Sequence, residues 1–196
     1  MGSFDEAVAA LRRGDVVVFP TETVWGIGAS ITSPRGVARI YEIKGRPEDR
    51  ALQVLVASAA LIAEVARAGP EAIRLAERLM PGPLTIVLPA RDGVPDLGGA
   101  GTIGVRAPAH PVALALLAAA GPVAASSANR SGEPTPRTLD EVRAIFGDDV
   151  DAYVDGEAGG GIPSTVVDLT GAEPVVLRMG PIGADRLAEV LGGPVG

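Results

Sequence analysis

The cationic side chains of this sequence converge on one short segment. Among its 17 lysine and arginine residues a single lysine, Lys44, occurs, and it is followed by Arg46 and Arg50. A lysine ammonium is a compact point charge, whereas an arginine guanidinium is a planar fork that binds two oxygens at once, so the group suits phosphate or carboxylate. Gly45 and Pro47 end the preceding helix here. An alternative stays open, because cations at a helix C-terminus also stabilise the helix dipole.

Two further segments carry small polar side chains directly after an apolar strand. Residues 21–23 (Thr-Glu-Thr) follow an expected strand, and residues 126–132 (Ser-Ser-Ala-Asn-Arg-Ser-Gly) follow another. Hydroxyl and amide groups placed there can hydrogen-bond a phosphate, a ribose or another small ligand. Both segments could equally be ordinary turns, because Ser, Thr and Asn side chains commonly satisfy loop backbone groups.

Several residues outside these segments have more than one possible role. Arg106 closes an apolar strand, where a cation is expected to face a ligand or a partner, or to be a satisfied edge residue. His110 is expected to cap the helix that follows it rather than to act in catalysis. Residues 159–161, three glycines, could bring backbone close to a substrate or form a loop without chemistry. Trp25 and Tyr41 are expected in the core or in a cleft wall.

Composition excludes several classes of protein. With 47% hydrophobic residues over 196 positions the chain can bury a substantial core, and the absence of cysteine with a single histidine excludes disulfides and Cys or His metal clusters. A net charge of −7 with 3% aromatic residues argues against broad nucleic-acid binding, so weak or no direct nucleic-acid binding is expected. Without an apolar membrane span or a signal-peptide pattern, a cytoplasmic location is expected.

Apolar periodicity and capping signals predict helices alternating with strands along the chain. Helices are expected at 4–13, 34–44, 59–67, 70–80, 110–120 and 184–191, and one more is capped by Thr138 and ends at Phe146. Strands are expected at 16–19, 52–57, 84–88, 102–106, 123–126 and 152–154, with two more joined through residues 171–174. Neither a linker nor a repeat is visible, so residues 1–196 are expected to form one domain.

This alternation predicts an α/β sheet covered by helices, with a cleft along one edge where the polar motifs follow strand ends. The sequence lacks a P-loop, the third glycine of a dinucleotide fingerprint, and the motifs of serine and zinc hydrolases. Any chemistry must therefore rest on the positioning of substrates and on charge.

Taken together, six segments resemble the YrdC-like threonylcarbamoyl-AMP synthases, over nearly the whole chain and in the family's order. They are residues 20–26, 44–47, 101–106, 126–132, 164–168 and 177–178. The resemblance implies a single-domain, open, twisted, mixed α/β sheet with helices on its faces and a deep cationic cleft. It also implies condensation of L-threonine, bicarbonate and ATP into threonylcarbamoyl-AMP and pyrophosphate, a nucleotidyl transfer that feeds threonylcarbamoyladenosine modification of tRNA through downstream transfer proteins.

The resemblance also implies roles for individual residues, with Arg106 pairing the threonine carboxylate. Threonine would be contacted by Thr23, Arg106, Ala125 and Ser164. The nucleotide and its phosphates would be held by Lys44, Arg46, Arg50, Thr102, Ser127, Asn129, Thr135 and Arg178. No residue acts as a chemical catalyst in this scheme, and Mg2+ is expected to arrive with ATP rather than at a protein site of its own.

Departures from the family pattern leave alternatives open. Arg50 and Leu55 stand where the family often has asparagine and histidine, Trp25 replaces a tyrosine, and Met179 replaces a proline. The chain resembles the short form, without the extra C-terminal domain of longer members. One alternative is a paralogue of the same fold that acts on another carbamoyl or acyl adenylate. Another is an RNA-binding module, which the acidic net charge disfavours.

Overall fold

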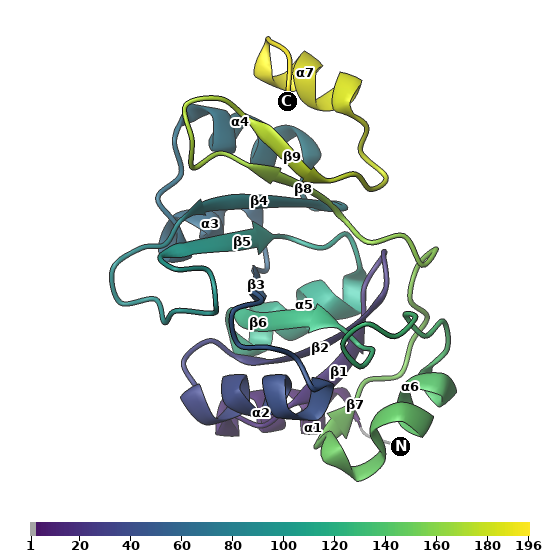
Figure 1. The fold of residues 1–196 in the computed structure, drawn as a ribbon. Coiled ribbons are helices and arrows are strands. Elements are labelled where there is room, and N and C mark those ends of the chain that lie inside the picture. The colour runs from purple at the N-terminus through teal and green to yellow at the C-terminus, as the bar shows by residue number, and fades with distance from the viewer. Residues whose placement is uncertain (1–2) are drawn as a thin grey trace.

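The computed structural model describes residues 3–196, whose strands form one mixed sheet in the order β7-β1-β2-β6-β3-β5-β4-β8-β9 (Figure 1). Parallel pairs are β1/β7, β3/β5 and β4/β8, and the other neighbours are antiparallel. The strands are β1 (Val17–Pro20), β2 (Trp25–Ser30), β3 (Gln53–Leu55), β4 (Leu84–Pro89), β5 (Thr102–Arg106), β6 (Val123–Ser127), β7 (Ala152–Tyr153), β8 (Thr165–Asp168) and β9 (Val175–Arg178).

Helices begin and end where the sequence places caps. Ser3 and Glu6 form a capping box at the first helix, which ends at Gly14 with a left-handed φ of 82°. The helix before Lys44 ends at Gly45, also left-handed with φ 56°. The helices are α1 (Phe4–Arg13), α2 (Pro34–Lys44), α3 (Ile62–Val65), α4 (Pro70–Leu79), α5 (Pro111–Ala120), α6 (Leu139–Phe146) and α7 (Ala184–Leu191), with 3-10 turns η1 (Ala59–Leu61) and η2 (Gly147–Asp149).

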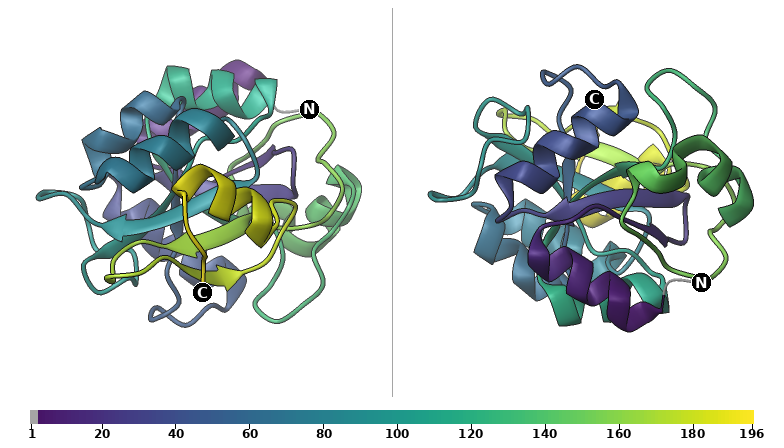
Figure 2. Two further views of the ribbon diagram at one scale, coloured as in Figure 1. Left: turned by 90° about the horizontal axis from the view of Figure 1, so that it is seen from above. Right: turned by 90° about the horizontal axis from the view of Figure 1, so that it is seen from below.

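Helices lie on both faces of the sheet, α1, α4 and α5 on one side and α2 on the other (Figure 2). The pleat of β1 divides its side chains between two core clusters, since Val17 and Phe19 pack with α1 and α5 while Val18 joins the other cluster. The predicted fold class, an open mixed α/β sheet with helices on its faces, is therefore confirmed. Within residues 3–196, the helices all fall short of the length and apolar character needed to cross a membrane.

Two expectations about elements are wrong. Strand β2 is absent from the strands expected above, and the two glycines in its Trp-Gly-Ile-Gly start are poor strand formers. It pairs with β1 and β6, and Gly28 lies so close to β6 that a Cβ there would be 2.5 Å from a methyl group of Val123. The helix expected at 59–67 is instead the 3-10 turn η1 followed by the four-residue α3, after which Ala66 forms an isolated bridge with Ala90.

Candidate functional site

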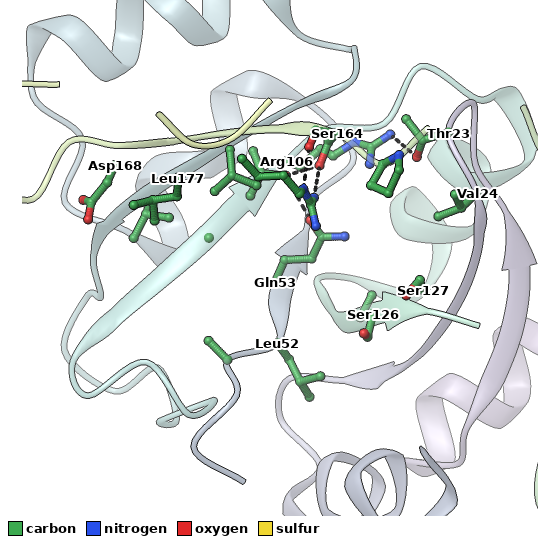
Figure 3. A pocket seen from close by; sticks show the side chains of 18 of the residues that line it. Thr23, Val24, Leu52, Gln53, Arg106, Ser126, Ser127, Ser164, Asp168 and Leu177 are labelled. Carbon is green, nitrogen blue, oxygen red and sulfur yellow. Dashed lines mark hydrogen bonds between the residues drawn. The ribbon is translucent and has the colours of Figure 1, made fainter. Parts of the chain in front are cut away.

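A cavity of about 450 Å³ lies over the middle of the sheet, within the range of roughly 300–1,000 Å³ typical of small-molecule sites (Figure 3). Alternate residues of β5, namely Thr102, Gly104 and Arg106, line it, while the intervening Ile103 and Val105 are buried in the core. The expectation that the cleft lies along one edge of the sheet is therefore wrong. Side chains on the face of the sheet form the cavity instead.

Strands far apart in the sequence supply the lining. In Figure 3, Thr23 and Val24 lie at one end of the cavity, Asp168 and Leu177 at the other, and Gln53 between them. The lining residues are Thr23, Val24, Arg46, Ala51, Leu52, Gln53, Thr85, Val87, Thr102, Gly104, Arg106, Ala125, Ser126, Ser127, Pro163, Ser164, Val166, Asp168, Leu177 and Arg178. Three guanidinium groups therefore face one space beside hydroxyl groups, which suits an anionic ligand.

Arg106 is the most deeply buried cation of the lining, with 3% of its side chain exposed. Its Nε donates to the carbonyl of Gly82 at 3.1 Å, and its Nη2 donates to Oγ1 of Thr23 at 2.9 Å. The same Nη2 lies 2.7 Å from Oε1 of Glu22 in an ion pair. Burial lowers the pKa of Arg106 and Glu22 opposes this effect, but a guanidinium stays protonated in proteins. These contacts fix the orientation of a buried positive charge at the cavity wall.

On the other side of the cavity, a chain of hydrogen bonds links four polar side chains, from Arg178 to Gln53. Arg178 donates from Nε to the carbonyl of Ser164 at 3.0 Å and from Nη2 to its Oγ at 3.1 Å. Oγ of Ser164 lies 2.8 Å from Oγ1 of Thr85, which donates to Oε1 of Gln53 at 3.0 Å. Burial first, and then the positive charge of Arg106, lower the pKa of Arg178. Two cations held near each other favour an anion between them.

The two cations at the end of α2, Lys44 and Arg46, lie in different environments. Arg46 lines the cavity, and its guanidinium donates to the carbonyls of Arg50 at 3.0 Å and Ala51 at 2.9 Å. Lys44 is 2% exposed, and its ammonium donates to the backbone carbonyls of Ser127 and Asn129. Burial first, and then Arg46, lower the pKa of Lys44 to about 8. Lys44 therefore joins the end of α2 to the segment after β6.

The structure brings most of the sequence-predicted site residues to the cavity. Those that line it are Thr23, Arg46, Thr102, Arg106, Ala125, Ser127, Ser164 and Arg178. Four are not among the lining residues, namely Lys44, Arg50, Asn129 and Thr135. Asn129 is buried, and its amide donates to the carbonyls of Arg130 and Glu133, whereas Arg50 is exposed. The ligand roles expected for all these residues stay predictions.

Sequence reasoning gave no site role to several residues, although Glu22, Asp168 and Leu177 lie in segments that it had singled out. Gln53, Thr85, Asp168 and Leu177 line the cavity, and Glu22 contacts Arg106 behind it. A signal for Thr85 was present, because β4 reads Leu-Thr-Ile-Val, with one polar residue among buried apolar ones. A polar residue in an otherwise apolar strand is expected on a face that meets a ligand or another polar group.

Other single-residue expectations meet different outcomes. His110 occupies the N-cap position of α5, as expected, but its side chain makes no capping hydrogen bond. Its Nε2 lies 3.1 Å from the carbonyl oxygen of Glu157. Trp25 and Tyr41 are both buried in the core, as expected. Leu55, at the position of the family's histidine, is buried in the core and is not among the lining residues.

Sequence comparison decides the family. A family model named Sua5_yciO_yrdC and described as "Telomere recombination" matches residues 9–180. A putative threonylcarbamoyl-AMP synthase of Mycobacterium tuberculosis is 44% identical over 190 residues, which are 95% of this chain and 88% of that protein. The chain belongs to the Sua5/YciO/YrdC family.

Longer members of the family resemble it over part of their length. A threonylcarbamoyl-AMP synthase of Pyrococcus abyssi is 43% identical over 191 residues, 95% of this chain but 56% of that protein. The crystal structure of P. abyssi Sua5 complexed with L-threonine superposes with a TM-score of 0.93 at 41% identity, covering 98% of this chain and 58% of that one. This chain thus spans little more than half the length of the P. abyssi protein in either comparison.

Proposed function

We propose that this protein is an L-threonylcarbamoyladenylate synthase, a nucleotidyltransferase that condenses L-threonine, bicarbonate and ATP. The observation that carries the proposal is the buried, oriented Arg106 at the wall of a cavity in a fold that superposes on P. abyssi Sua5 complexed with L-threonine. In this proposal Arg106 binds the carboxylate of threonine, while Thr23, Ala125 and Ser164 contact the rest of the amino acid.

The nucleotide occupies the remaining part of the cavity in this proposal. Arg46 and Arg178 face it as forked donors that can each bind two phosphate oxygens. Thr102 and Ser127 supply hydroxyl groups from neighbouring parts of the sheet. Lys44, Arg50, Asn129 and Thr135 belong to the expected nucleotide set. In our account Lys44 holds the carbonyls of Ser127 and Asn129 beside the phosphates, and the Asn129 side chain holds the turn that follows.

The chemistry needs positioning more than a dedicated acid or base. The threonine amine and bicarbonate form a carbamate with loss of water, and a carbamate oxygen then attacks the α-phosphorus of ATP, so that pyrophosphate leaves. Holding the reactants together and neutralising negative charge can supply much of such a rate enhancement. The three arginines of the cavity provide that charge.

Magnesium enters this scheme bound to ATP, as part of the substrate. In residues 3–196 no cluster of three or more His, Cys, Asp or Glu side chains is arranged to hold a metal ion. Mg2+ usually takes one or two protein carboxylates together with phosphate oxygens and water, and Asp168 is an acidic residue of the cavity lining that fits this need. The product would pass to tRNA threonylcarbamoyl-transfer proteins, and a cytoplasmic location stays a prediction.

Pyrophosphate release tests the proposal. With ATP and magnesium, release is expected only when threonine and bicarbonate are both present, because neither alone forms the carbamate. Equal release without threonine would overturn the proposal. Release with another amino acid but not threonine would instead favour a paralogue that acts on a different adenylate.

A further inference from the structure

Glu22 is a half-buried acidic residue for which the expected ligand contacts give no role. Its side chain is 19% exposed, but both carboxylate oxygens are buried, and within residues 3–196 neither receives a well-aligned hydrogen bond. The only close polar contact of this carboxylate among those residues is the ion pair with Arg106 at 2.7 Å. Leaving a charged group without hydrogen bonds is costly, so its retention beside the cavity calls for a function.

Arg106 keeps a free donor nitrogen, Nη1, among its contacts with residues 3–196. A guanidinium has five N–H bonds. Nε donates to Gly82 and Nη2 to Thr23, with Glu22 in ion-pair distance of Nη2, whereas Nη1 makes no hydrogen bond to the residues that the structure describes. A ligand carboxylate can therefore bind Nη1 while Glu22 stays in place. Such a carboxylate would share the Arg106 guanidinium with Glu22, so the negative charge of Glu22 would act on the bound ligand.

The backbone of residues 159–161 covers the loop that holds Glu22. The amides of Gly159 and Gly161 donate to the carbonyls of Thr21 and Thr23, both at 2.9 Å. A Cβ at Gly159 would overlap the carbonyl oxygen of Glu22. Glu22 is thus held in a site that little water enters, and a charge in such a site acts on its neighbours with weak screening.

We propose that Glu22 is a specificity-determining residue that selects ligands with an ammonium group next to their carboxylate. Arg106 and Glu22 form a neutral pair of opposite charges, which matches the neutral pair of an α-amino acid zwitterion. A ligand with a carboxylate alone gains the attraction of Arg106 but suffers the repulsion of Glu22, whereas the ammonium of a zwitterion offsets that repulsion. The inference rests on the proposed function, since it takes the cavity to bind an amino acid.

Calorimetry with two matched ligands tests this role without turnover. The ligands are L-threonine and 2,3-dihydroxybutanoate, in which a hydroxyl replaces the ammonium, and the measured quantity is the ratio of their dissociation constants. The wild-type protein is expected to bind threonine at least tenfold more tightly. In Glu22→Gln this preference falls by about tenfold, the equivalent of about 1.4 kcal/mol, while Glu22→Asp keeps it because the charge remains. Glu173→Gln, an exposed change in the β8–β9 turn, leaves it unaltered.

Each other outcome overturns the inference. If Glu22→Gln weakens both ligands equally, Glu22 only holds Arg106 in place, and if both ligands bind more tightly, Glu22 is a competitor for the carboxylate site. If the wild-type protein binds the two ligands equally well, the inference is overturned. This result needs no variant, so it can be obtained even if Glu22→Gln does not fold. Failure of the wild-type protein to bind threonine contradicts the proposed function itself, which keeps the two claims distinguishable.

Discussion

Replacing Arg46 by lysine tests whether the site needs the forked donors of a guanidinium rather than a positive charge alone. Its guanidinium donates to two backbone carbonyls at 3.0 and 2.9 Å and still faces the cavity. A lysine lacks the planar fork, so it cannot place donors on separate nitrogens against both carbonyls and still offer two parallel N–H bonds to a phosphate. We expect Arg46→Lys to lower kcat/KM for ATP by about tenfold or more.

The control for this change is Arg74→Lys, on the exposed face of α4 far from the cavity lining. It is expected to leave kcat/KM within about twofold of the wild-type value, since surface substitutions rarely change stability or chemistry. If Arg46→Lys behaves like this control, Arg46 does not contact the nucleotide.

Lys44 gives a direct test of burial at the site, because it is the single lysine of the sequence. Protein labelled with 13C-lysine therefore gives one side-chain signal. Burial and the neighbouring Arg46 lower its pKa to about 8 from an ordinary value of 10.5, so the signal is expected to titrate near pH 8. A titration midpoint near 10.5 would show that the ammonium is solvated and does not hold Ser127 and Asn129.

The same shift predicts how stability depends on pH. Between pH 8 and 10.5 the unfolded chain holds the Lys44 proton and the folded chain has lost it, so this residue makes the free energy of unfolding rise with pH in that window. The gain from pH 7 to 9.5 is on the order of 2 kcal/mol. Urea denaturation at both pH values, compared with Lys44→Met, measures it; an equal pH dependence in the two proteins is the contrary result.

Residues placed by a local motif could be predicted from the sequence, whereas residues whose contacts depend on the fold could not. Arg106 and Ser164 lie at the cavity as expected because their motifs fix the backbone positions. Lys44 belongs to an equally clear motif, yet its long side chain turns to the backbone carbonyls of Ser127 and Asn129, which only the fold brings to the end of α2. Glu22 was overlooked because its partner Arg106 is distant in the sequence and only the fold brings them together.

At the scale of elements, the glycine segment 159–161 offers a matched pair of substitutions. A Cβ at Gly159 would overlap the backbone of Glu22, whereas a Cβ at Gly160 would meet nothing within 4 Å. Gly159→Ala must therefore move the segment away from the loop, and we expect a loss of about 1–3 kcal/mol in unfolding free energy together with weaker threonine binding. Urea denaturation and calorimetry measure both effects.

Gly160→Ala should change neither quantity appreciably, because its added methyl group lies in open space. Should the two variants prove equally stable and bind threonine equally well, the tight contact between this segment and the loop of Glu22 does not exist in solution.

Elements with caps were predictable, and those set by tertiary contacts were not. The capping boxes at Ser3 and Thr138 mark α1 and α6 at the expected places. Strand β2 was missed because its glycines are poor strand formers, and it exists because close approach to β6 requires them. The alanine-rich stretch 59–67 has helical propensity, but its residues break into two short turns beside β4.

At the scale of the whole molecule, the order of the strands decides the site. Neighbours in the sheet such as β4 and β8 lie about 80 residues apart in the chain, and the pairing that places Thr85 beside Ser164 follows from that order. Sequence periodicity predicts strands but not their neighbours, which is why the cavity was expected at an edge. That residues 1–196 form one domain stays a prediction.

The proposed reaction also predicts what the protein does without partners. The arginines of the cavity face a small-molecule space, and the net charge of −7 opposes extended contact with RNA phosphates. Formation of the adenylate is therefore expected without tRNA, and its transfer to tRNA only after transfer proteins are added. A rate of adenylate formation that depends on tRNA, lost at raised salt, would favour RNA binding instead.

Mass spectrometry of the product tests the central claim most directly. The protein is incubated with ATP, magnesium, L-threonine and 13C-bicarbonate, and the nucleotides are separated and weighed. We predict an AMP adduct that carries the whole of threonine and one labelled carbon, formed by the wild-type protein and reduced at least tenfold in Arg106→Gln. An AMP adduct without the labelled carbon, or labelled product in equal amount from Arg106→Gln, would contradict the account.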